Sequence, residues 1–420
     1  MKSVQAYRYR WFILLSLVLL VFSVEIQWMN LSPMGRVANS FYSAHWLNRS
    51  LSVTDLFSFI FMGGFVLFSI PCSYLIYRIG IRWAAISSTV LIVLASLIKL
   101  LYVQDFVMMV IAQVVFSIAH AIVQNLITVT VARWFPIRER GMAVGLVSAC
   151  QYISLSFVML FSPYLMHDGS FVRLNAIYSI ISFVCALPCT LIFQENPPSP
   201  SSFVEPATLS YLKNFKLVDT IKSLRGIIII FAINWGIVMS LLVKIDFISS
   251  QMGIKAPSGF LGLTMLLSGA VGAVVIPSLS DRFKKRKFFY TLCMGMAVPG
   301  ILIMTFAKSA FMGYVGSAVL GYFAFSAIPV GLQYGAELGT GIAEEVVQGR
   351  IMFFSQAVGA VILLFTMSHD ELVFNHFLGF FIALFFACFV GSTFLSESKV
   401  IITEEERLDK VINQEIVHVE

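Results

Sequence analysis

The stretches "SYLIYRIGIR" (73–82) and "PSLSDRFKKR" (277–286) decide the fold, because each follows a long apolar segment and the two resemble each other. When they are aligned, Arg78 lies opposite Arg282, which is 204 residues further along the chain. A loop sequence that recurs at such a distance indicates a duplicated structural unit.

Further matches recur at nearly the same offset. "IQW" at 26–28 has a counterpart in "INW" at 233–235, and Gln151 has one in Gln356. Together these matches favour two related halves. Internal repeats of this kind are common in transporters, where the substrate site lies between the repeats.

The composition is that of an integral membrane protein. Hydrophobic residues make up 59% of the 420 residues, charged residues only 12%, and the mean hydropathy is +0.89. A water-soluble core cannot bury that much apolar surface. The six cysteines lie in or beside apolar segments without a C-x-x-C spacing, so they indicate neither disulfides nor a zinc site. We expect no metal and no cofactor.

The predicted fold is an all-α membrane protein with twelve transmembrane helices in two six-helix, pseudo-symmetric halves. A span needs about 20 mainly apolar residues, and the segments that fit are 11–35, 52–77, 82–102, 105–132, 141–165, 171–193, 225–250, 258–280, 288–307, 310–337, 347–367 and 371–394. One long polar connection separates the sixth span from the seventh. We therefore expect an N-terminal half at 1–193, a cytoplasmic linker at 194–224, a C-terminal half at 225–394 and a cytoplasmic tail at 395–420.

The basic residues predict the orientation in the membrane. Most of the 28 Lys and Arg residues fall in alternate connections, including "DRFKKRK" at 281–287, and cytoplasmic loops collect such residues. We therefore expect both termini in the cytoplasm and a cell-membrane location, either a bacterial inner membrane or a plasma membrane. The formal net charge of +6 does not indicate nucleic-acid binding, because no basic face or reading motif accompanies it.

No catalytic motif is present in the sequence. It contains no G-x-x-x-x-G-K-[ST] loop, no G-x-S-x-G and no H-E-x-x-H, so neither ATP-driven transport nor hydrolysis is indicated. We expect a protein that is not an enzyme. Its expected partners are a small-molecule substrate and the lipid bilayer, and we expect a monomer.

The repeated loop resembles the signature of the major facilitator superfamily, G-x-L-x-D-R-x-G-R-R. The second copy keeps Asp281, Arg282 and Arg286, and "ARWFPIRERGMAVG" between the fourth and fifth spans carries the same resemblance. In that superfamily the loop is a cytoplasmic latch for the outward-open state. The resemblance therefore implies gating roles for Asp281 and Arg282, and for Arg78 in the first copy, where Tyr77 replaces the Asp of the family.

A closer resemblance covers most of the chain. "RWFILLSLVLLVFSVEIQWMN", "IAQVVFSIAHAIVQNLI", "GLTMLLSGAVGAVVIPSLSDR" and "GLQYGAEL" followed by "FFSQAVGAVI" are similar to the feline leukaemia virus subgroup C receptor family. Its members are facilitative carriers linked to choline and ethanolamine, and haem and pyridoxine have also been proposed for some. The resemblance implies an aromatic cation site around Trp28, Gln151 and Gln356, with Glu337 also matching.

The sequence departs from that family at three positions. An aromatic pair of the seventh span is replaced by Val238 and Met239, and a glutamine of the fourth span is replaced by His120. The full set of expected substrate-binding residues is Trp28, Gln151, Gln356, Glu25, His120, Gln124, Trp235 and Met239.

Glu25 and Trp28 lie three residues apart in the first span, so they share one face of a helix. An indole face attracts a quaternary ammonium by roughly 0.5–2 kcal/mol. A carboxylate inside a membrane is costly unless it is paired or faces a cavity. Two alternatives stay open: Trp28 could belong to an interfacial aromatic belt, and Glu25 could make an interhelical hydrogen bond or lie in an outer vestibule.

The fourth span carries a stripe of polar residues at helical spacing: Gln113, Ser117, His120, Gln124 and Thr128. The stripe could line the substrate path, or it could supply the helix-to-helix hydrogen bonds that are common in membranes. His120 alone could carry a proton or ligate haem iron, although a lone histidine is more often a hydrogen-bonded core residue.

Glu337 lies near the cytoplasmic end of the tenth span. It could balance a cationic substrate, or it could brace the inner gate through Arg133 or Arg350. The expected gating residues are therefore Asp281, Arg282, Arg78 and Glu337.

The leading functional hypothesis is an alternating-access carrier for a choline- or ethanolamine-like cation, working by facilitated diffusion. The alternative is a proton-coupled importer of an amino acid, vitamin or nucleoside that uses Glu25 and His120. A haem transporter or a non-transporting haem-binding receptor is a third and weaker hypothesis.

Overall fold

The computed structural model describes residues 7–31, 38, 40–42, 53–165, 170–199, 211–243, 245, 248–249, 252, 259–366, 371–398 and 400. Within these residues every regular element is an α-helix. The long helices are α1 Arg10–Trp28, α3 Val53–Leu101, α4 Phe106–Trp134, α5 Ile137–Leu165, α6 Phe171–Ile192, α8 Lys222–Val243, α10 Gly259–Phe283, α11 Arg286–Thr305, α12 Ala310–Leu338, α13 Glu344–Thr366 and α14 Glu371–Thr393, and the short α7 is Tyr211–Val218.

The described residues contain the twelve transmembrane segments of the predicted fold, which is confirmed. Helix α3 supplies two of them, because Gly80 breaks its helical path with a φ of +82°, a conformation that glycine adopts without steric cost. Helix α14 contributes the shorter apolar segment Leu378–Thr393.

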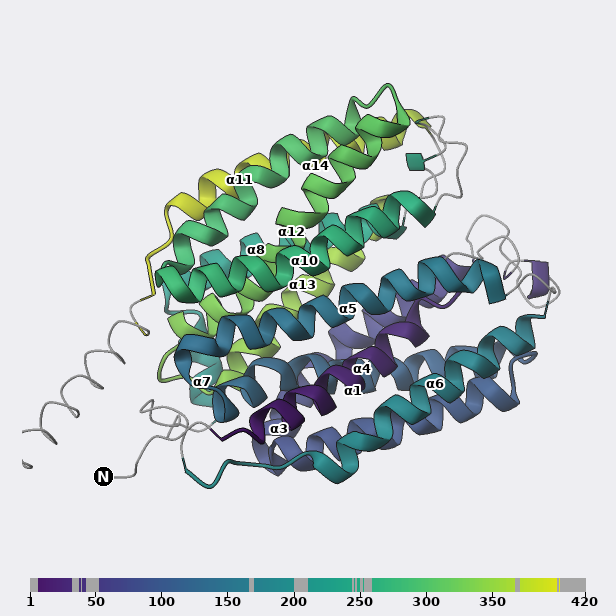
Figure 1. Ribbon diagram of the computed structural model, residues 1–420, viewed down its shortest axis with the longest axis horizontal. Coiled ribbons are helices and arrows are strands. Elements are labelled where there is room, and N and C mark those ends of the chain that lie inside the picture. The colour runs from purple at the N-terminus through teal and green to yellow at the C-terminus, as the bar shows by residue number, and fades with distance from the viewer. Residues whose placement is uncertain are drawn as a thin grey trace, which may run out of the picture.

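The helices form two groups (Figure 1), with α1 and α3 to α6 in the lower group and α8 and α10 to α14 in the upper group. Part of the predicted linker, 200–210, and most of the predicted tail lie outside the described residues. The three boundaries between the four predicted segments therefore stay a prediction.

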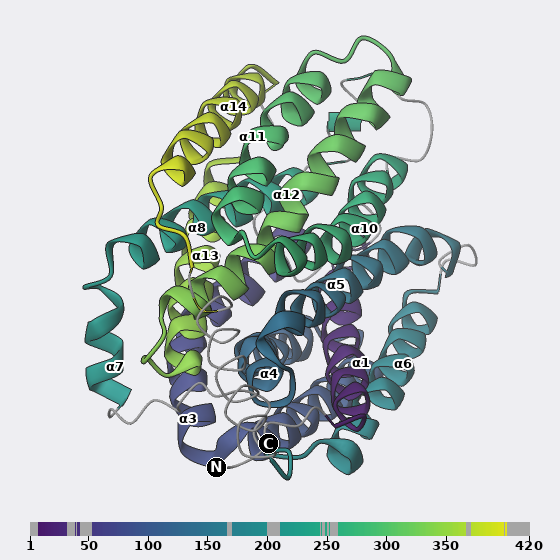
Figure 2. The ribbon, with the colours of Figure 1, turned by 60° about the vertical axis from the view of Figure 1, so that its left-hand side comes forward.

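The two halves pack most extensively along two helix pairs, α5 with α10 and α3 with α13 (Figure 2). At both places a glycine permits close approach. A Cβ on Gly145 would lie 2.1 Å from the carbonyl oxygen of Ala273, and one on Gly349 would lie 2.7 Å from Cβ of Ser73. Small residues let helix backbones approach closely in membranes, so side-chain size fixes the spacing of the halves.

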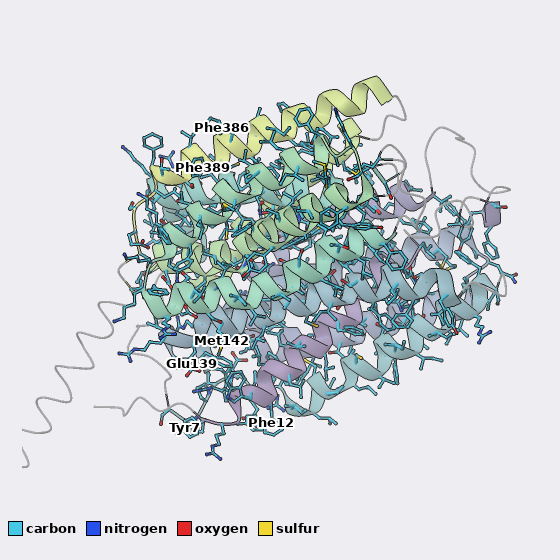
Figure 3. The ribbon with its side chains drawn as sticks, turned by 45° about the horizontal axis from the view of Figure 1, so that its top comes forward. Tyr7, Phe12, Glu139, Met142, Phe386 and Phe389 are labelled. Atoms are coloured by element: carbon cyan, nitrogen blue, oxygen red, sulfur yellow. The ribbon has the colours of Figure 1, made fainter. Side chains whose placement is uncertain are left out.

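The start of α1 is held against the first turn of α5. The Arg10 guanidinium forms an ion pair with Glu139 at 2.9 Å, and Figure 3 labels Glu139 in α5 and Phe12 at the beginning of α1. The ion pair therefore holds the N-terminal end of α5 against the N-terminal end of α1.

In each half, a glutamate that follows the last helix accepts one or two hydrogen bonds from backbone N–H groups at the start of the third span. We name this contact the acid clasp. In the N-terminal half, Glu195 follows α6 and accepts hydrogen bonds from the backbone N–H groups of Ile81 and Arg82, at 3.2 and 2.9 Å. In the C-terminal half, Glu397 follows α14 and accepts one from the N–H of Lys287 at 3.0 Å. Each carboxylate thus caps the N-terminus of the third span in its half, where the helix dipole favours negative charge.

An aromatic residue completes each acid clasp. The Trp134 indole donates to the carbonyl of Gln194, and the Tyr334 hydroxyl donates to the carbonyl of Ser396. The two carbonyls immediately precede the two clasp glutamates in the sequence. The clasps therefore extend the internal repeat beyond the residues that the sequence comparison identified.

The N-terminal clasp predicts the stability of Glu195 variants. Glu195→Ala removes the cap of two N–H groups and the ion pair with Arg133, and we expect it to lower the free energy of unfolding by about 1 kcal/mol. Glu195→Gln keeps an acceptor and is expected to lose less. Thermal unfolding of the purified variants in detergent measures both, and equal losses in the two variants would contradict the capping role.

Candidate functional site

A cavity lies between the two halves and is lined by side chains from six helices, α1, α3, α4, α5, α8 and α13. All of the expected substrate-binding residues except Gln124 line it. The sequence analysis missed four further lining residues: Phe61, Met62, Tyr152 and Leu155. These are apolar or aromatic residues in apolar spans, and nothing in their spacing separates them from lipid-facing neighbours.

Glu25 is the centre of the polar contacts in this cavity. Its Oε2 accepts a hydrogen bond from Nε1 of Trp28 at 2.6 Å. Its Oε1 lies 3.0 Å from Nε2 of Gln151, 3.3 Å from Nε2 of Gln124 and 3.2 Å from Nε2 of His120. Gln124 therefore belongs to the site as a partner of the carboxylate, although it does not line the cavity.

The burial of Glu25 explains why so many nitrogen atoms surround it. Glu25 is only 4% exposed and His120 only 3%, and a buried carboxylate is costly unless hydrogen bonds or an opposite charge compensate it. Interhelical hydrogen bonding and a cavity position, which the sequence left as alternatives for Glu25, are therefore both present.

Aromatic rings form a continuous stack beside the carboxylate. The Trp28 and Phe61 rings are parallel, with centroids 4.9 Å apart and an angle of 5°. Phe61 then stacks on His120 at 4.7 Å, and Phe65 meets His120 edge-on at 5.2 Å. Trp28 is half-buried and packs on Phe61 beside the carboxylate, which favours a position in the cavity wall over one in an interfacial belt.

The wall from the C-terminal half has unused hydrogen-bonding atoms. Trp235 and Gln356 are 5% and 3% exposed, and among the residues that the structure describes neither Nε1 of Trp235 nor Oε1 of Gln356 has a hydrogen-bond partner. Unpaired buried polar atoms are costly, so a donor and an acceptor directed at this cavity are available to a ligand.

The cavity is narrow in this conformation. Its volume is about 20 Å³, which is room for about one water molecule. Two contacts between the halves flank it: Met62 of α3 packs against Ala360 and Leu363 of α13, and the Tyr152 hydroxyl donates to the carbonyl of Phe325 at 3.1 Å. A larger ligand needs the halves to separate.

The polar stripe of α4 serves several partners in turn. Besides the contacts of His120 and Gln124 with Glu25, Nε2 of Gln113 lies 3.5 Å from the carbonyl of Trp28. The Thr128 hydroxyl donates to Gln348 of the opposite half at 3.0 Å. The stripe therefore contributes side chains to the site and also makes hydrogen bonds between helices, which are the two roles that the sequence left open.

Lys99 is a positioning residue that the sequence analysis missed. Its Nζ donates to the carbonyl of Gln27 at 2.7 Å and lies 5.0 Å from the ring centre of Phe116, and the residue is 2% exposed. Because α1 ends at Trp28, the Gln27 carbonyl is one of the four that lack an intrahelical partner. A cation there is favoured by the helix dipole.

Lys99→Met is expected to destabilise the protein and to disturb the position of Trp28. A buried polar group that loses its hydrogen-bond partner costs roughly 1–3 kcal/mol, so the midpoint of thermal unfolding should fall by several degrees. Lys308→Met, at an exposed position, is the matched control and should leave the midpoint unchanged. Equal midpoints for both variants would contradict the capping role.

A second polar cluster, which we name the gate cluster, lies where α5 meets α10, α11 and α12. Nε and Nη2 of Arg286 donate to Oε1 of Glu337 at 3.0 and 2.8 Å. Nη2 of Arg286 also lies 2.5 Å from Oδ1 of Asp281. Oδ2 of Asp281 accepts from the N–H of Met142, in the first turns of α5, at 2.8 Å, so the cluster joins the two halves.

The gate cluster differs from the sequence expectation in two respects. Glu337 binds Arg286 rather than Arg133 or Arg350, and Arg350 binds Asp219 at 2.6 Å. The sequence could not choose among these arginines because each lies close to the end of a span.

The two other expected gating residues lie outside the gate cluster. Arg282 is exposed. Arg78 is exposed as well and donates to the hydroxyl of Tyr74 at 2.9 Å. Arg286, rather than its neighbour in the loop motif, therefore holds the two buried carboxylates together.

Asp281→Asn is expected to weaken the contact between the halves, because the charge that pairs with Arg286 and caps Met142 is lost. Hydrogen bonds to charged groups contribute roughly 1.5–3 kcal/mol. The fraction of molecules in which the two halves are apart at the gate cluster should therefore rise about tenfold or more. Distances between spin labels at Arg138 and Lys285, both exposed, measure that population after the native cysteines are replaced. Arg282→Gln is the control, and an equal shift in both variants would refute the assignment.

Comparison with known proteins places this geometry among transporters. The model of the Major Facilitator Superfamily matches residues 13–363. The human choline/ethanolamine transporter FLVCR2 is 22% identical over 90% of this chain and 74% of its own length. An uncharacterised transporter of Caenorhabditis elegans of the same superfamily type is 24% identical over 84% of this chain, which spans 63% of the length of that relative.

The fold is also shared with a solved structure. The crystal structure of the human organic anion transporter MFSD10 matches with a TM-score of 0.70 and 12% identity, over 90% of this chain and 99% of that one. At such identity the likeness concerns the fold alone. The relatives named FLVCR confirm the resemblance that the sequence motifs indicated.

Proposed function

The chain belongs to the Major Facilitator Superfamily, and from this premise we propose that it carries a small organic cation of the choline or ethanolamine type by alternating access. The observation that carries the proposal is that Trp28, Gln151 and Gln356 line one cavity between the halves together with Glu25, which Trp28 and Gln151 contact directly. These three residues are the ones that the family resemblance implied.

The proposed roles follow from the chemistry of the side chains. The faces of Trp28 and Trp235 attract a quaternary or primary ammonium, by up to about 2 kcal/mol each when water is excluded. The Glu25 carboxylate compensates the positive charge of the substrate in a buried site. The unpaired Oε1 of Gln356 accepts a hydrogen bond from the hydroxyl of choline or from the ammonium of ethanolamine.

Alternating access is proposed to separate the contacts that now narrow the cavity. Met62 and Tyr152 bridge the halves beside the site, and the gate cluster bridges them at the start of α5. A cation larger than water can enter only when one of these sets opens. If the cation crosses without a counter-ion, the membrane potential contributes about 2.3 kcal/mol per charge per 100 mV to the driving force.

The proposed setting is a cell membrane, with both termini in the cytoplasm and a monomeric chain. The two acid clasps support this orientation, because their capped helix ends carry the basic sequences Arg78 to Arg82 and Arg282 to Lys287. Basic residues concentrate on the cytoplasmic side.

A proton-coupled importer of a neutral solute is the second candidate. The contact of 3.2 Å between Nε2 of His120 and Oε1 of Glu25 favours it, because such a pair can exchange a proton with water. Uptake of an amino acid, vitamin or nucleoside that increases with inward proton flow would support this candidate over the cation carrier.

Uptake of radiolabelled choline and ethanolamine into liposomes that contain the purified protein tests the leading proposal. We expect saturable uptake in the wild type and a loss of about tenfold or more in kcat/KM for Trp28→Ala, since 1.4 kcal/mol corresponds to a factor of ten. Trp83→Ala, which removes an indole that is 63% exposed, is the matched control. Absence of uptake of both cations, or equal uptake by both variants, would refute the proposal.

A further inference from the structure

We propose that a proton and the organic cation occupy the Glu25–His120 pair in turn, so that the carrier exchanges one cation for one proton. This inference rests on the proposed function and deepens it, because it assigns the energy coupling of the same site. Its basis is the balance of charge and hydrogen-bond donors around a single buried carboxylate.

The cavity needs one positive charge to become electrically neutral. With His120 neutral, the ionised Glu25 gives the buried site a net charge of −1, and with His120 protonated the net charge is zero. The remaining lining residues named above are uncharged. A substrate cation beside Glu25 restores neutrality only if His120 is neutral, so binding of the cation and protonation of the imidazole are alternatives.

The hydrogen-bond geometry of His120 fits two protonation states. Its Nε2 lies 3.2 Å from Oε1 of Glu25 and 2.9 Å from Nε2 of Gln124. The carboxylate oxygen requires a hydrogen on the ring nitrogen, whereas the amide nitrogen, itself a donor, requires a lone pair there. Nε2 therefore satisfies Glu25 when it carries a hydrogen and Gln124 when it does not. Gain or loss of one proton changes which partner is satisfied.

The opposite ring nitrogen supports the same conclusion. Nδ1 of His120 is buried and has no hydrogen-bond partner within the described part of the chain. No carbonyl or carboxylate there fixes the tautomer, as such a partner usually does for a structural histidine. Gln124 and Gln151 can each direct an amide N–H at Glu25 in either state. The carboxylate therefore keeps hydrogen bonds after the proton has left.

The other ionisable groups near Glu25 do not replace His120. Cys150 and Tyr152 of α5 interact with Glu25 electrostatically, but thiol and phenol groups are neutral near pH 7. Lys99 of α3 is committed to the carbonyl of Gln27. The cavity walls from α8 and α13 contribute Trp235, Met239 and Gln356, which do not ionise.

The exchange balances in atoms and charge. As the cation arrives from one side, the N–H bond of the His120 imidazolium breaks, its electron pair stays on nitrogen, and the proton passes to water on that side. After the halves reorient, the cation leaves and His120 takes a proton from water on the other side. The site is neutral during both crossings, because an unpaired charge at the membrane centre is costly.

The test uses liposomes that contain the wild-type protein, a pH-sensitive dye in the lumen, and radiolabelled choline outside. With the lumen 1.5 pH units more acidic than the outside, one-for-one exchange should drive choline to an accumulation of about 30-fold, since each unit contributes a factor of ten. The lumen should become more alkaline as choline enters. A potassium diffusion potential imposed with valinomycin should leave the initial rate unchanged.

The outcomes separate this inference from the proposed function. Choline uptake that follows the diffusion potential without a change in luminal pH would overturn the exchange and leave the cation carrier standing. Acidification of the lumen during uptake would also overturn it, in favour of co-transport. Absence of uptake of both choline and ethanolamine would overturn both proposals.

Two variants locate the proton on the pair. His120→Asn removes the group that titrates, and Glu25→Gln removes the charge that the proton and the cation share. In a variant that is folded by thermal unfolding and still transports, we expect choline flux to become sensitive to the diffusion potential and to lose its response to pH. Flux from a folded His120→Asn variant that still raises the luminal pH would contradict the assignment, and the wild-type measurement decides the question if neither variant folds.

Discussion

The burial of one carboxylate, that of Glu25, is the constraint on which the rest of the site depends. Within hydrocarbon an ionised group needs compensation from every direction, and Trp28, His120, Gln124 and Gln151 supply it from α1, α4 and α5. The same contacts orient the indole of Trp28 and tie three helices of the N-terminal half together. Site geometry and packing of that half therefore have a common cause.

Buried carboxylates are compensated differently in the Glu25 site and in the gate cluster. Glu25 is surrounded mainly by neutral donors and a histidine, which leaves its charge available to a cation or a proton. In the gate cluster a permanent cation, Arg286, lies against both Asp281 and Glu337, and such charge-assisted contacts are strong and directional. The first arrangement suits exchange of a ligand, and the second suits a contact that holds two halves in register.

Much of the fold could be predicted from the sequence because it depends on local properties. Apolar length predicted the spans, and repeated motifs predicted the two halves. Most of the candidate site followed from family resemblance and helical spacing. What failed was the choice of partners: Glu337 was assigned to Arg133 or Arg350, and Lys99 was overlooked. Charged residues at span ends look alike in a sequence, and distance alone decides which of them pair.

The order of the amino acids alone predicts the membrane class, the twelve spans, the duplication and the residue types available to a cavity. Hydropathy and repeats can be measured along the chain without any knowledge of how the helices pack. Only the tertiary structure decided that Glu25 meets His120, 95 residues away, and that Glu195 and Glu397 cap equivalent helices. These contacts join residues on different helices. Their geometry depends on how the helices pack, and hydropathy and spacing along one segment carry no information about it.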